Sequence, residues 1–95
     1  IRDRVNSMEI KLTQGSREKF NQLNHKAVRL YIKSACWSGV VLGVSPDEKR
    51  DNDEYVFVEG HMFVIEEGLY ASIPKDITID YVESGLRRGF KVYLN

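Results

Sequence analysis

Cys36 is the residue of this sequence with the most distinctive chemistry, because it is the only cysteine in 95 residues. A thiolate is a soft ligand that suits iron and iron–sulfur clusters. Its neighbours are small except for Trp37, so backbone N–H groups could approach a thiolate or a sulfide closely; the small ones are Ser34, Ala35, Ser38 and Gly39. A free cysteine is also often a small buried hydrophobe. The residue alone therefore leaves two interpretations open, a ligand or a core position.

The other candidate ligands and bases are isolated in the sequence. His25 and His61 are the only histidines, and neither has a closely spaced ligand partner. We expect both to be structural or solvent-facing. The acidic run 51–54 does not fit an EF-hand, which would require glycine in place of Val56 and glutamate in place of Met62. No catalytic set is recognisable, and we therefore predict that the protein is not an enzyme.

Arg87 and Arg88 form the one notable basic pair, inside the segment 85–89. This segment lacks the length and the Lys-Ser/Thr ending of a phosphate-binding loop. It is either a solvated turn or a docking contact for an acidic partner. The chain as a whole has 14 basic and 14 acidic residues and a net charge of zero. Such a balance provides no field for nucleic acid or for an anionic membrane, so we predict neither as a partner.

Residues 1–7 are charged and contain no apolar signal region, and the apolar stretch 35–44 is too short to span a bilayer. With a lone thiol, these features favour a reducing compartment, most simply the cytoplasm. We expect residues 1–7, which precede Met8, to be an added or disordered extension. One domain should then cover residues 8–95.

Hydrophobic periodicity predicts the elements that must position Cys36. A short strand at 9–12 should lead into a helix that begins after Thr13 as N-cap and ends near Asn24, with Phe20 and Leu23 facing inward. Further strands are expected at 27–33, 39–45, 55–58, 61–65, 77–82 and 90–94, with a second short helix within 66–73. The pair Glu59-Gly60 should form a two-residue hairpin turn. The sequence thus predicts a strand-rich α+β domain with about two short helices.

Two segments resemble those of a known family. Residues 28–39 read as a strand that enters a small-residue turn with a cysteine and a nearby glycine, and residues 79–91 end in Gly-Leu-Arg-Arg-Gly-Phe-Lys. Both are similar to segments of the A-type iron–sulfur carrier family (HesB/IscA-like). The intervening hairpin, short helix and strand follow in the same order. The resemblance covers residues 8–94.

The resemblance implies curved mixed sheets in a HesB-like sandwich, usually in homodimers or higher homo-oligomers. Members of the family bind iron or an iron–sulfur cluster and exchange it with donor or recipient proteins. They use one mid-chain cysteine and a C-terminal Cys-Gly-Cys pair. Only Cys36 can be carried over, so we expect a divergent member without that pair. Other subunits, glutathione or a partner protein would have to complete the ligand set around Cys36.

Two alternatives to a carrier remain open at this level. The chain can be a protein-interaction module that keeps the HesB fold without binding metal, using its sheet surface or the Arg87–Arg88 turn. It can also be a thiol-based redox protein, in which case Cys36 must be exposed and activated. The surroundings of Cys36 distinguish these interpretations.

Overall fold

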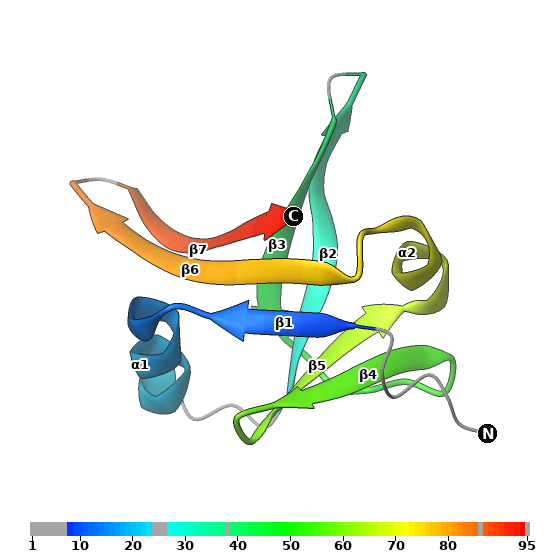
Figure 1. The fold of residues 1–95 in the computed structure, drawn as a ribbon, viewed down its shortest axis with the longest axis horizontal. Helices are drawn as coiled ribbons and strands as arrows, with labels where there is room; N and C mark the ends of the chain where they lie inside the picture. The colour runs from blue at the N-terminus through cyan, green and yellow to red at the C-terminus, as the bar shows by residue number, and fades with distance from the viewer. Residues whose placement is uncertain (1–7, 24–26, 38, 86, 95) are drawn as a thin grey trace.

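The computed structural model describes residues 8–23, 27–37, 39–85 and 87–94. Within them, seven strands and two helices form two separate sheets (Figure 1). The expectations for residues 1–7 and for His25 lie outside the described residues. No helix in the described ranges is long and apolar enough to cross a membrane. The predicted strand-rich α+β class is confirmed.

The smaller sheet has the order β1-β6-β7, with β1 parallel to β6 and β6 antiparallel to β7. Its strands are β1 (Glu9–Leu12), β6 (Asp76–Ser84) and β7 (Arg87–Leu94). Alternation within β6 decides which face it buries, because Ile77 and Ile79 are fully buried while Asp76, Thr78 and Asp80 are only half-buried. This face of the sheet closes one side of the core.

The larger sheet has the order β3-β2-β5-β4 and mixes antiparallel pairs with a parallel β2–β5 pair. Its strands are β2 (Ala27–Cys36), β3 (Gly39–Pro46), β4 (Asp53–Val58) and β5 (His61–Glu66). The predicted turn between β4 and β5 is confirmed: Glu59 and Gly60 both have positive φ, 52° and 87°. That combination is typical of the tight turn whose twist matches the flanking strands.

Helix α1 (Gln14–Leu23) begins where the sequence predicts. The Ser16 backbone N–H donates to Thr13 Oγ1 at 3.3 Å, which confirms Thr13 as the cap. The buried Ser16 hydroxyl also lies 2.8 Å from the Ile79 carbonyl oxygen, so it ties the helix to β6. The prediction that Leu23 faces inward is wrong, because Leu23 is 38% exposed. Phe20, one turn earlier, is only 2% exposed and is the apolar side chain of α1 that packs in the core. The second helix, α2 (Glu67–Ser72), is stopped by Pro74 shortly after its end.

Both sheets and α1 share one hydrophobic core. Phe20 lies at its centre, edge-on to Phe63 at 5.4 Å between ring centroids and stacked on Phe90 at 4.5 Å. These contacts join the helix to one strand of each sheet. The fully buried Leu30, Ile65, Ile77 and Ile79 fill the space around them.

Arg29 organises the outer face of the larger sheet. Its guanidinium donates to both carboxylate oxygens of Asp53 at 2.6 and 3.0 Å, to Asp47 at 2.6 Å and to the Glu48 carbonyl oxygen at 3.0 Å. The side chains of Arg29 and Asp53 are only 12% and 6% exposed. The segment between β3 and β4 is therefore fastened to β2. The strand neighbour Val64 is fully buried on this face.

This ion pair shifts the titration of both partners. Hydrogen bonds from Arg29 lower the pKa of Asp53 to about 2, from an ordinary value of 3.8, against the opposing effect of burial. The carboxylate in turn raises the pKa of Arg29. A depressed pKa in the folded state means that Asp53 stabilises the fold at neutral pH and that this contribution is lost as pH falls.

The pH dependence of unfolding tests this cluster. As pH falls from about 4 to about 2, the wild-type protein should lose about 2 kcal/mol of unfolding free energy through Asp53 alone. Asp53→Asn should be less stable at pH 7, and its urea midpoint should depend less on pH in this window. Asp51→Asn, a change at an exposed position of the same loop, is the matched control and should behave like wild type. Equal pH slopes for all three proteins would contradict the assignment.

Candidate functional site

Strands β2 and β3 run past the core and form a two-stranded arm that projects from the body of the molecule (Figure 1). Val28 and Leu30 of β2 are buried, but Ile32 on the same strand is already 50% exposed. Beyond Leu30, β2 has lost its partner β5 and pairs only with β3. The sequence predicted a strand that ends at residue 33. In the structure, β2 continues along the arm to Cys36.

A β-bulge at Lys33 lies within this arm. Ile32 pairs with Leu42 and Ser34 pairs with Val41, so Lys33 is the extra residue without a partner in the register. A bulge bends its strand and re-aims the side chains around it. The arm is therefore bent where it leaves the core, and Lys33 is placed at the bend.

Cys36 is the last residue of β2 and lies at the tip of the arm, where its backbone pairs with Gly39. Gly39 has a φ of 145°, a conformation that favours glycine and closes the tip. The Cys36 side chain lies outside the described part of the structure. Trp37, the next residue, is 99% exposed, and Ala35 and Val40 are exposed as well. The described residues on either side of Cys36 are thus exposed to solvent.

The described residues do not form a metal-binding set of their own. Among them, no group of three or more His, Cys, Asp and Glu side chains is arranged to hold a metal ion. His61 is half-buried, with its ring centroid 5.5 Å from that of Phe20.

The arm carries exposed apolar side chains. Ile32, Val40 and Val41 are at least two-fifths exposed, in addition to Trp37 at the tip. An apolar groove of about 600 Å³ continues from Ile32 and Val40 towards α2 and the end of β7. Periodicity could not reveal this surface, because a β-strand alternates in the same way whether a core or a partner covers it.

The predicted docking pair lies on the second hairpin, at the start of β7. Arg88 is exposed, and its Nε lies 3.8 Å from Glu83 Oε2 across the β6–β7 pair. A contact of this length between two exposed groups contributes little to stability. The side chain of Arg87 lies outside the described part. The structure therefore leaves Arg88 available, and it brings Lys33 and Lys91 to the same groove, which sequence reasoning did not anticipate.

Trp37, the only tryptophan, reports directly on the exposure of the tip. Its emission maximum should be close to that of tryptophan in water and should barely shift when the monomeric protein is unfolded in urea. Trp37→Ala should change the unfolding free energy by less than about 0.5 kcal/mol, because its side chain packs on no core residue. Phe20→Ala, the control, should cost about 3–5 kcal/mol. A blue-shifted emission that depends on the fold would contradict this placement of the tip.

Comparison with known proteins identifies the fold. No protein-family model and no curated protein matches this sequence. Among solved structures, IscA with a [2Fe-2S] cluster aligns with a TM-score of 0.71 and 14% identity, over 90% of this chain and 85% of that one. Escherichia coli SufA, involved in biosynthesis of iron–sulfur clusters, gives 0.68 and 21%, over 90% and 79%. A protein from Aquifex aeolicus gives 0.68 and 16%, over 100% of both chains. The chain therefore has the HesB/IscA-like fold of the A-type iron–sulfur carriers.

Proposed function

We propose that this chain binds iron or an iron–sulfur cluster as cargo through Cys36 and passes it between donor and recipient proteins. The observation that carries the proposal is the position of the only cysteine, at the tip of an exposed arm. The chain also shares its fold with SufA and with the cluster-bearing IscA. The chain acts in this account as a carrier and not as a catalyst.

The ligand count requires more than one molecule. An iron–sulfur cluster is usually held by about four thiolates, and this chain has one cysteine. Two or four copies would contribute two or four sulfur atoms, and glutathione or a partner protein can supply the rest. A cysteine that binds metal must remain a free thiol and not be consumed in a disulfide, and this favours a reducing compartment such as the cytoplasm.

A homo-oligomer is supported by the exposed apolar residues of the arm. Ile32, Val40, Val41 and Trp37 lie on the same projecting hairpin as Cys36. Ile32 and Val40 share one apolar groove, and exposed apolar surface of this kind marks interaction sites in soluble proteins. If two copies associate through their arms, burial of this surface and convergence of the Cys36 thiols occur in the same contact.

A second candidate is an interaction module that has kept the fold without metal binding. It is favoured by the exposed apolar side chains of the arm, such as Ile32 and Val41, which offer a contact surface that needs no metal. The two candidates differ in one respect that can be measured, namely whether any metal is retained.

Anaerobic reconstitution with ferrous iron and sulfide tests the proposal. Wild-type protein should develop visible charge-transfer absorption, with at most about one cluster per two chains, because each chain supplies one thiolate. Cys36→Ser should lose the absorption. Ser34→Ala, on the same exposed arm, is the matched control and should keep it.

Absorption that persists in Cys36→Ser would show that Cys36 is not the ligand. A folded wild-type protein without any absorption would favour the interaction module instead.

A further inference from the structure

A basic groove of about 500 Å³ lies between the β2–β3 arm and the β6–β7 hairpin. Three cationic side chains line it, Lys33 from the arm and Arg88 and Lys91 from β7, and Val82 and Phe90 supply apolar surface. No carboxylate is among the described residues that line it. Since the chain carries no net charge, this is a local concentration of positive charge.

The bulge places Lys33 in this groove. Lys33 is the residue that the β2–β3 register skips, so its position at the bend is a consequence of the backbone and not of a side-chain contact. It forms no hydrogen bond or ion pair with a described residue. With no such partner among the described residues, the Lys33 ammonium can meet an anion that enters the groove.

Lys91 is equally unpaired within the described part of the chain. Its cross-strand neighbour is Asp80, but one oxygen of that carboxylate accepts hydrogen bonds from Thr13 Oγ1 at 2.6 Å and from the Tyr81 N–H at 2.8 Å. Asp80 is thus engaged at the start of α1. Among the described residues, the acidic contact of a lining side chain is the long, exposed Glu83–Arg88 pair at 3.8 Å.

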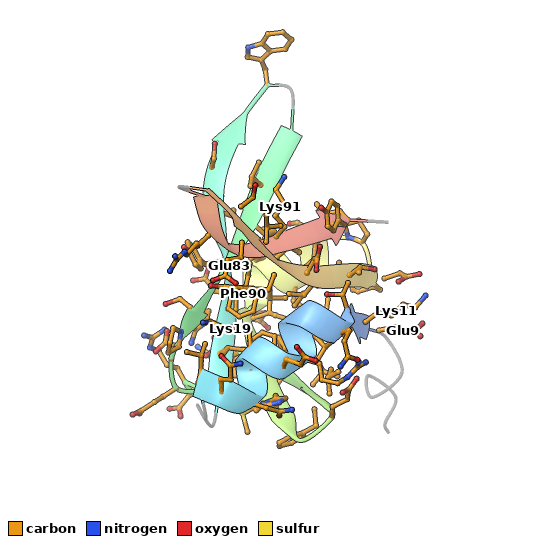
Figure 2. The ribbon with its side chains drawn as sticks, turned by 90° about the vertical axis from the view of Figure 1, so that its left-hand side faces the viewer. Glu9, Lys11, Lys19, Glu83, Phe90 and Lys91 are labelled. Atoms are coloured by element: carbon orange, nitrogen blue, oxygen red, sulfur yellow. The ribbon has the colours of Figure 1, made fainter. Side chains whose placement is uncertain are left out.

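The surroundings of the groove extend both its charge and its apolar character. Phe90 packs against Tyr81, and the Lys19 ammonium lies 4.9 Å from the Tyr81 ring centroid. Figure 2 shows Lys91, Phe90, Glu83 and Lys19 on one side of the molecule, between the arm and α1. The surface therefore offers several cations around a patch of aromatic rings.

We propose that this groove docks an acidic segment of the protein that exchanges cargo with this chain, with carboxylates at Lys33, Arg88 and Lys91 and an apolar side chain against Phe90. This inference rests on the proposed carrier function. Lys33 precedes Cys36 by three residues on one strand, which places the docked segment about 10 Å from the tip. Charge complementarity of this kind guides encounter and orientation.

The chemistry favours a peptide segment over other anions. A free phosphate would use the cations but would gain nothing from Val82 and Phe90, the apolar part of the lining. Nucleic acid would need a broad basic surface, whereas this chain is neutral overall. An acidic peptide with an apolar residue satisfies both properties of the groove.

Fluorescence anisotropy with metal-free protein tests the docking separately from cargo binding. The probe is a fluorescein-labelled eight-residue peptide in which glutamates surround one central leucine, and a lysine-for-glutamate peptide is its control. The acidic peptide should bind wild type at low salt, and its affinity should fall as the salt concentration rises. Lys33→Glu/Lys91→Glu should weaken binding by about tenfold or more. Lys11→Glu/Lys49→Glu makes the same charge change elsewhere on the exposed surface and should stay within about twofold of wild type.

Three outcomes would overturn the inference: equal binding by the two double variants, binding of the lysine peptide, or full competition by millimolar phosphate or glutathione. Cys36→Ser separates this inference from the proposed function. Docking that survives in Cys36→Ser supports the groove even if no cluster forms, whereas cluster formation without docking by wild type would overturn the groove alone.

Discussion

The structure depends on one constraint, that strand β2 is longer than the core it crosses. Its first residues, including Val28 and Leu30, pack between β3 and β5 over the Phe20–Phe63 contact. The remaining residues have only β3 as a partner, and two strands alone bury little apolar surface. The excess length must therefore leave the body as an arm, and the sequence puts its only cysteine at the end of that arm. Site and fold are linked through this single strand.

The base of the arm is held more firmly than its tip. Arg29, on β2, fastens the β3–β4 segment through Asp47 and Asp53, so the strand is fixed on its outer face as well as in the core. Beyond Leu30 the side chains become more exposed along the arm, from 50% at Ile32 to 99% at Trp37. A fixed base and an exposed tip suit a group that must reach another molecule in a defined direction. The basic groove includes Lys33, and the exposed apolar residues lie on the same arm, so a partner docked as proposed would lie close to Cys36.

The sequence predicted those features that depend on local patterns. Alternation located the strands, Thr13 marked the start of α1, and Glu59-Gly60 marked a tight hairpin. It could not predict where burial ends along a strand, because Ile32 continues the alternation of Val28 and Leu30 without sharing their environment. The sequence could not predict long-range partners either. Arg29 pairs with Asp47 and Asp53, which lie 18 and 24 positions further along the chain. The bulge at Lys33 has no sequence signal of its own, and the groove that it helps to form was missed for that reason.

The most direct test of the account is the rate at which Cys36 reacts with iodoacetamide in the native, metal-free protein, compared with the rate in urea. A thiol on an exposed arm should react within about tenfold of the unfolded chain, since no opening of the core is needed. Protection by about a thousandfold or more, relieved only on global unfolding, would show that the thiol is enclosed by the fold and would contradict the account.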